Sequence, residues 1–175
     1  MTDDQLKPTL LRQLDIAWSF ARYHLDGLTT EACLWRPGAR GLHVHHRGDG
    51  TWTADWPDRE SYDIGPPSAA WTTWHIGFWW SMTLDHSFGT GTLTREQVLW
   101  PGTADGVRKW LGGLHDEWQR QAEALDSAAW GRTELVRWPF TERSFADLAA
   151  WVNLELMKNA AEIGATLFQR GAGKG

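Results

Sequence analysis

The residues of this chain best suited to chemistry are one histidine and three polar residues that interrupt apolar helical patterns. His75 stands inside the aromatic run 71–80, which reads WTTWHIGFWW, and Glu155, Asn159 and Glu162 stand in an apolar pattern late in the chain. In a helix Glu155 and Asn159 lie one turn apart, so both can face a single ion or ligand. We therefore predict a polar pocket between two helices, with His75 opposite Glu155 and Asn159.

Each of these polar residues also has a structural interpretation. His75 could be a core imidazole that one hydrogen-bond partner satisfies. Glu155 could pair with a basic side chain or keep its carboxylate in solvent, and Asn159 could simply bridge two helices through its amide. Glu162 could be a solvated residue at the flank of its helix. The sequence leaves both interpretations open.

Tryptophan is the unusual feature of the composition, with 14 copies in 175 residues. Such large rings bury much apolar area, so most of them must lie in the core or in a pocket wall. The aromatic residues also exceed what one small core can bury, so we expect exposed aromatic surface that forms a homodimer interface. The candidates for the wall of a ligand pocket are Trp71, Trp74, Trp79 and Trp151.

The remaining histidines and the single cysteine favour structural roles. His43, His45 and His46 form a second group, but their charged neighbours favour an exposed hairpin over a metal site. His115 lies in a polar stretch of a predicted helix, which favours exposure to solvent. Cys33 has no histidine or basic cluster near it in the sequence, so we expect a buried, inert thiol.

Four long stretches have apolar residues at helical spacing, and each is bounded by capping residues or glycine. This pattern predicts an all-α protein, a four-helix bundle in a single domain over residues 1–171, with a flexible tail at 172–175. In such bundles, sites form on the inward faces of opposing helices. The predicted helices cover residues 4–26, 68–88, 103–125 and 144–170.

Between the first two helices lies a long irregular insert, residues 36–67. Short alternating runs flank Gly48, Asp49 and Gly50, which predicts a small hairpin. Irregular segments of this length usually serve a site or a partner. Trp52 and Trp56 are the candidates for covering the mouth of the pocket or contributing to a dimer interface.

Charge and hydropathy exclude several classes of function. The net charge is −5, from 17 basic and 22 acidic residues, and the basic residues are scattered. A nucleic-acid backbone would meet repulsion, so we expect no nucleic-acid partner. No apolar run approaches the roughly 18 residues of a membrane span. The lone cysteine and the lack of a secretory signal predict a cytoplasmic protein.

Four segments carry a family resemblance: CLWRP at 33–37, DGTWTADWP at 49–57, WTTWHIGFWW at 71–80 and WVNLELMKNAAEIG at 151–164. Through them the chain resembles the DinB/YfiT-like superfamily, a group of small helical bundles described as metal enzymes. The resemblance covers nearly the whole chain. It implies a divalent-metal site made by one histidine of the second helix and two histidines one turn apart on the last helix.

The chain matches only the first of these ligands. His75 corresponds to the histidine of the second helix, whereas Glu155 and Asn159 stand where the histidine pair is expected. The chain thus resembles a branch that lacks this pair. A histidine, a carboxylate and an amide are a harder donor set than three imidazoles, so affinity for zinc or nickel should fall and preference should move toward manganese or magnesium.

Two functions follow from the resemblance and the residues together. In the first, a metal-dependent hydrolase or thiol-dependent transferase uses a metal to activate a water or a low-molecular-weight thiol. Glu162 would then orient the site or act as its catalytic base. In the second, the same groove binds a small apolar or aromatic molecule without catalysis, and His75 and Glu155 are its polar anchors.

Overall fold

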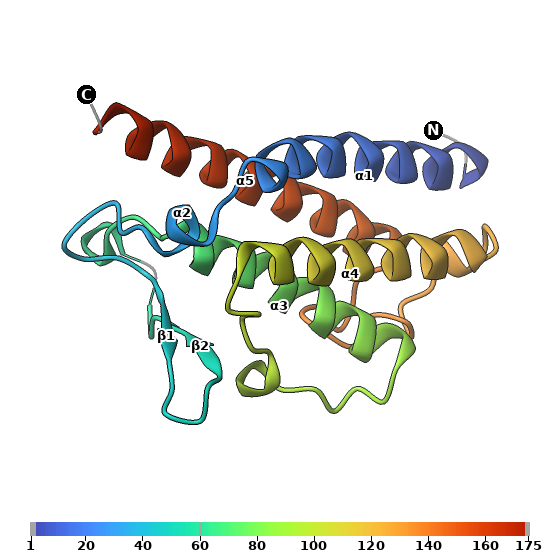
Figure 1. The fold of residues 1–175 in the computed structure, drawn as a ribbon. Helices are drawn as coiled ribbons and strands as arrows, with labels where there is room; N and C mark the ends of the chain where they lie inside the picture. The colour runs from blue at the N-terminus through green and yellow to red at the C-terminus, as the bar shows by residue number, and fades with distance from the viewer. Residues whose placement is uncertain (1–2, 60, 174–175) are drawn as a thin grey trace.

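A computed structural model describes residues 3–59 and 61–173, and four long helices dominate it (Figure 1). This confirms the predicted all-α bundle. The long helices are α1 (Asp3–Asp26), α3 (Ala69–Phe88), α4 (Ala104–Ala124) and α5 (Phe145–Ala172). The shorter elements are α2 (Thr30–Leu34), strands β1 (Val44–His46) and β2 (Trp52–Ala54), and the 3-10 turns η1 (Tyr62–Ile64), η2 (Arg95–Gln97) and η3 (Ala129–Gly131).

The helices begin where side chains can cap them. The Ser68 hydroxyl accepts a hydrogen bond from the Trp71 backbone N–H at the start of α3, and Ser144 forms a capping box with Asp147 at the start of α5. Such caps satisfy backbone donors that a first turn leaves unpaired. The end of α5 lies beyond the predicted one, because the helix continues through Gly171 to Ala172. Residues 174–175 of the predicted tail lie outside the described residues.

The helices form two parallel pairs that run in opposite directions (Figure 1). α1 and α5 run side by side: Asn153 Nδ2 donates to the Leu10 carbonyl at 2.9 Å, and Gly164 lies against the ring of His24 further along. α3 and α4 run the other way, so the connection 89–103 returns along the length of the bundle. The most extensive contacts between the long helices follow the cyclic order α1, α5, α3, α4.

Aromatic side chains of α3 fill much of the core, and a glycine makes their packing possible. Trp74 and Trp80 are each 2% exposed. Gly77 lies under the ring of Trp110 from α4, where an added Cβ would be 1.9 Å from the nearest ring atom. The glycine inside the aromatic run is therefore required for close contact between α3 and α4.

The insert contains the predicted hairpin, in which β1 pairs antiparallel with β2 and Val44 lies opposite Ala54. Two predictions of exposure were wrong. His43, just before β1, is only 6% exposed, because the base of the insert packs on the bundle, although His45 and His46 are exposed as expected. His115 is also 6% exposed, because its ring stacks on Trp18 of α1.

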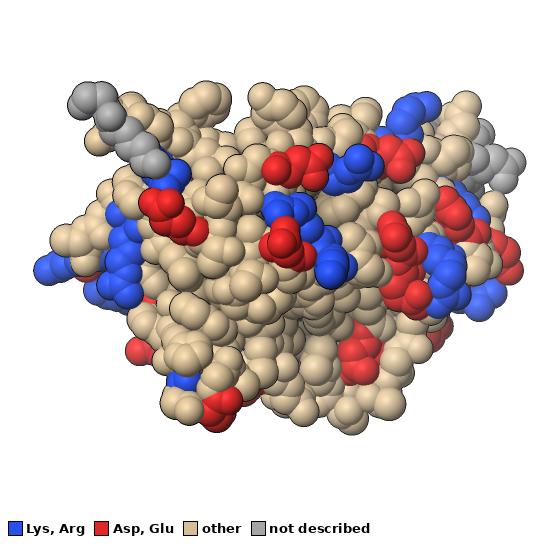
Figure 2. Space-filling model, viewed as in Figure 1, with Lys and Arg blue, Asp and Glu red and all other residues tan. Residues whose placement is uncertain are grey.

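Charged side chains of both signs intermingle on the face seen in Figure 2, over α1 and α4, and the lower part of this face is largely uncharged. The basic residues do not gather into one patch there. Across the described residues, every helix is too short or too polar to cross a lipid bilayer.

Candidate functional site

Both ring nitrogens of His75 are bound by neighbouring side chains. The indole Nε1 of Trp79, one helical turn away on α3, donates to His75 Nε2 at 3.0 Å. A neutral imidazole that accepts at Nε2 carries its proton on Nδ1. His75 Nδ1 therefore donates to Asn159 Oδ1 on α5, at 3.3 Å, so His75 contacts one of the two α5 residues predicted to lie opposite it, while Glu155 pairs with Lys158.

This environment keeps His75 uncharged. The pKa of the imidazole is lowered to about 4, mainly by burial. The bond to Asn159 opposes this change, and the charge of the nearby Lys158 acts in the same direction as burial. Burial dominates because an imidazolium loses its hydration among aromatic rings. His75 is thus a neutral hydrogen-bonding group throughout the physiological pH range.

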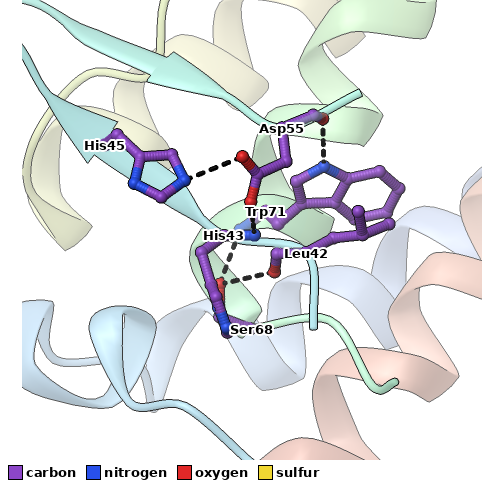
Figure 3. Close-up of polar contacts among 6 residues, drawn as sticks. All are labelled: Leu42, His43, His45, Asp55, Ser68 and Trp71. Atoms are coloured by element: carbon purple, nitrogen blue, oxygen red, sulfur yellow. Dashed lines mark hydrogen bonds and ion pairs between the residues drawn. The ribbon is translucent and has the colours of Figure 1, made fainter. Parts of the chain in front are cut away.

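The insert fixes the ring that stacks on His75. Trp71 and His75 have ring centroids 4.7 Å apart and planes inclined by only 14°. As Figure 3 shows, Trp71 Nε1 donates to the Asp55 carbonyl, while the Asp55 carboxylate accepts from the His43 backbone N–H and contacts His45 Nε2, each at 2.8 Å. Ser68 and Leu42 join the same segments through a backbone hydrogen bond of 2.9 Å. The hairpin therefore orients a wall of the site.

Two cavities adjoin His75. One, of about 400 Å³, lies beneath the insert, and we call it the insert cavity. The other, of about 240 Å³, is lined mainly by aromatic rings, and we call it the aromatic cavity. His75, Trp56 and Lys158 line both. The insert cavity is also lined by Leu42, Ile64, Trp71 and Glu162, and the aromatic cavity by Phe78, Trp79, Trp138, Trp151 and Glu155.

Three charged side chains of α5 reach these cavities. Glu155 Oε2 lies 2.9 Å from Lys158 Nζ, an ion pair whose angles fall short of a hydrogen bond. Burial raises the pKa of the Glu162 carboxyl, and the charge of Glu155 raises it further, against the opposing effect of Lys158. The single ammonium of Lys158 therefore does not offset the burial of the Glu162 carboxyl.

The predicted metal ligands do not form a ready coordination site. His75 would have to release Trp79 or Asn159 to present a nitrogen lone pair, and the Oδ1 of Asn159 is held by His75. Among the described residues, no three His, Cys, Asp or Glu side chains converge closely enough to hold an ion. The donor set thus does not fit a divalent cation in this arrangement, and the predicted metal stays a prediction.

The other predicted residues are distributed around the cavities. Trp71 lines the insert cavity, and Trp79 and Trp151 line the aromatic cavity with ring centroids 3.9 Å apart. Trp74 lies behind them in the core, where its indole donates to the Val98 carbonyl at 2.8 Å. Glu162 lines the insert cavity. Of the two tryptophans of the insert, Trp56 lines both cavities.

Sequence reasoning missed four residues that line the aromatic cavity: Phe78, Trp138, Pro139 and Lys158. Lys158 could have been found, because it lies three and four residues from Glu155 and Glu162 and so shares their helix face. Phe78 also follows His75 at helical spacing. Trp138 gave no such signal, since it belongs to the irregular connection before α5.

Two other buried groups lie outside these cavities. Cys33 is fully buried as predicted, and burial raises the pKa of its thiol to about 11. Burial and the charge of Arg36 lower the pKa of His43, whose ring nitrogens have no hydrogen-bond partner among the described residues. Neither group faces the cavities beside His75.

Comparison with known families supports the resemblance seen in the sequence. The model of the DinB superfamily matches residues 13–163, which include all of α3 and α4 and most of α1 and α5. The chain belongs to the DinB superfamily. No curated protein and no solved structure matches it significantly. Family membership gives the fold, while the activity has to be argued from the site of this DinB-superfamily protein.

Proposed function

We propose that this DinB-superfamily protein is a non-catalytic, small-molecule-binding bundle in which the metal site of the family has degenerated. The observation that carries the proposal is the double engagement of His75 by Trp79 and Asn159. A histidine that serves as a metal ligand needs a free nitrogen lone pair. Here the lone pair accepts an indole N–H, and the other nitrogen carries a proton.

The space around His75 supports binding of a small molecule. Ligand sites are concave and mostly apolar, with a few placed polar groups. The insert and aromatic cavities, about 400 and 240 Å³, have this character, with His75, Glu162 and Lys158 among their polar groups. A ligand with an apolar body would displace water from the aromatic walls, and its polar end would meet the charged side chains of α5.

A metal-dependent hydrolase or thiol-dependent transferase is the competing function. Its support is Glu162, because a carboxyl with a raised pKa is suited to proton transfer near neutral pH. Glu162 would act as a base only on a molecule bound in the insert cavity. This function also requires an ion, and His75 would have to leave its present partners to hold one.

Metal content separates the two functions. We would purify the untagged protein and the His75→Ala variant without chelators and measure bound metal by mass spectrometry, before and after dialysis against zinc, nickel, manganese or magnesium. The proposal predicts no stoichiometric ion in either protein. About one ion per chain in the wild type, lost in His75→Ala, would support the metal enzyme instead.

Ligand binding is the second half of the test. An environment-sensitive hydrophobic dye should bind the wild type and be displaced by small apolar molecules. Trp151→Ala opens the wall of the aromatic cavity from a half-buried position, and Trp56→Ala removes a side chain common to both cavities. Both variants should weaken dye binding. Unchanged dye affinity in both would contradict a ligand site beside His75.

A further inference from the structure

We infer that the aromatic cavity binds the quaternary ammonium group of an organic cation. This inference rests on the proposed function, because it names the class of small molecule that the bundle binds. It depends on three observations: the mutual orientation of the rings, the balance of charge around the cavities, and the shortage of free hydrogen-bond acceptors.

The rings of the aromatic cavity stand at steep angles to one another. Trp138 makes angles of 74° with Trp79, 70° with Trp151 and 77° with Phe78, at centroid distances of 5.9, 6.1 and 5.6 Å. Trp56 meets Phe78 at 67° and 5.4 Å. These rings line the same cavity, and rings inclined in this way can turn π faces toward it from several directions. Such a cage suits a cation, because the face of each ring is electron-rich.

Contacts behind the cage hold two of these rings in place. Trp79 is fixed by its hydrogen bond to His75. Phe78 stacks on the core residue Trp74, with planes inclined by 10° and centroids 5.3 Å apart. A cage whose walls are already ordered loses little conformational entropy when a ligand binds.

The charges beside the cavities favour a positive ligand. Among the described residues, Glu155 lines the aromatic cavity and Glu162 lines the adjoining insert cavity, while the ammonium of Lys158 reaches both. Arg95, whose guanidinium lies 4.9 Å from the centroid of the Trp56 ring, is paired with Glu96 at 2.6 Å. Because His75 is neutral, Glu155 and Lys158 balance each other at the aromatic cavity, and Glu162 gives the described residues of the two adjoining cavities together an excess of one negative charge. A bound cation would compensate that charge, whereas an anion would add to it.

The shortage of acceptors favours a quaternary ammonium over a primary amine. A primary ammonium has three N–H donors, each of which needs an acceptor when it leaves water. Among the described residues that line the aromatic cavity, the Nε2 of His75 already accepts a hydrogen bond and the one carboxylate, Glu155, forms an ion pair with Lys158, so three N–H donors would not all find acceptors there. A quaternary ammonium has no N–H group, so aromatic faces and a diffuse negative charge are sufficient to bind it.

Isosteric probes test the inference directly. We would titrate the protein with choline, with benzyltrimethylammonium, and with 3,3-dimethylbutan-1-ol, the uncharged isostere of choline, and follow tryptophan fluorescence and heat. Each cation should bind at least about tenfold more tightly than the alcohol, as expected for desolvated cation–π contacts. Equal concentrations of sodium chloride control for ionic strength.

Two variants assign the binding to the aromatic cavity. Trp138→Ala should weaken binding of both cations about tenfold. Lys158→Met removes the competing positive charge and should tighten it about threefold to tenfold, since repulsion between like charges is lost. Lys109→Met makes the same change of net charge at an exposed position of α4 and should leave cation affinity unchanged. Lys158 is itself exposed, so this variant keeps the test decisive if Trp138→Ala fails to fold.

The outcomes distinguish this inference from the proposed function. If the alcohol binds as tightly as the cations, or if Lys158→Met weakens the cations, the cavity does not select positive charge. The inference is then overturned while small-molecule binding stands. If the hydrophobic dye, the alcohol and both cations all fail to bind, the proposed function falls as well.

Discussion

Two histidines in this bundle lie in nearly identical stacks but in different surroundings. His75 stacks on Trp71 at 4.7 Å and 14°, and His115 stacks on Trp18 at 4.5 Å and 11°. Each also meets a second indole edge-on, Trp79 for His75 and Trp80 for His115. Histidine on tryptophan is therefore a packing motif of this protein, and by itself it does not mark a site.

The difference lies in what surrounds each stack. His75 adjoins the insert and aromatic cavities and charged side chains of α5. His115 packs in the interface of α1, α3 and α4, and its polar contact is the neighbouring Asp116, at 3.0 Å, on the exposed rim. The site is thus defined by the space and charge around the imidazole rather than by the imidazole itself.

The largest predicted effect distinguishes the packed surroundings of His115 from the surroundings of His75, which adjoin the two cavities. Trp80 is 2% exposed and stands edge-on to Trp18, so Trp80→Ala should lower the free energy of unfolding by about 3–5 kcal/mol. Trp138 is only half-buried beside a cavity, and Trp138→Ala should cost about 1–2 kcal/mol. Urea denaturation measures both. Equal losses of unfolding free energy in Trp80→Ala and Trp138→Ala would contradict the distinction between the two surroundings.

The next effect is the dependence of stability on pH. The pKa of His75 is about 4 in the folded protein and about 6.5 in the unfolded chain, so only the unfolded chain takes up the proton between these values. The contribution of the neutral, buried His75 to the free energy of unfolding is complete above pH 6.5. It is lost as pH falls toward 4, by up to about 3 kcal/mol. Denaturation at several pH values measures it.

Two variants assign this pH dependence to His75. His43, whose pKa burial also lowers, contributes in the same sense, and Glu162, whose pKa is raised, contributes in the opposite sense. The difference between wild type and His75→Gln isolates the His75 contribution. His115→Gln removes the other stacked imidazole and serves as the matched control. A wild-type slope in His75→Gln would contradict the burial of a neutral His75.

A smaller effect tests the indole that caps His75. Trp79→Phe keeps an aromatic ring but removes the donor to Nε2, so the neutral imidazole loses a stabilising bond. The pKa of His75 should rise toward 6.5, and the variant should lose about 1–2 kcal/mol of stability. Imidazole resonances in an NMR pH titration measure the first effect. An unchanged pKa would mean that the indole bond does not hold the neutral form.

A substitution on the outer face of α1 should have the smallest effect on the surroundings of His75 and His115. Ile16, Phe20 and Tyr23 are exposed at helical spacing, and we now predict that this face of α1 forms the interface of the expected homodimer. Phe20→Arg should convert a dimer to a monomer in light scattering at micromolar concentration, with ligand affinity unchanged. A monomeric wild type would contradict the dimer, and altered ligand affinity would couple this face to the cavities.

The sequence predicted the helices well because their determinants are local. Apolar periodicity and the caps at Ser68 and Ser144 depend on residues within one or two turns. The approach of His75 to Asn159 was also foreseen, since each interrupts an apolar face that must be buried. The hydrogen bonds of His75 were not foreseen, because they depend on which of several possible partners binds its Nε2. In the structure this partner is Trp79, one helical turn away.

The cavity walls could be predicted only in part. Trp71, Trp79 and Trp151 stand on helices, where spacing fixes their direction. Trp138 reaches the cavity from an irregular connection, whose path depends on the whole fold rather than on its own residues. His115 was placed at the surface because its sequence neighbours are polar, while the ring that buries it belongs to a distant helix.

The most direct test of the account is the state of the His75 imidazole in solution. Nitrogen-15 NMR of the ring, recorded against pH and with added zinc or nickel, reads the protonation of each nitrogen. We predict a proton on Nδ1, an unprotonated and hydrogen-bonded Nε2, a pKa near 4 and no response to one equivalent of metal. A pKa near 6.5, or a stoichiometric shift of either nitrogen on adding metal, would contradict the account.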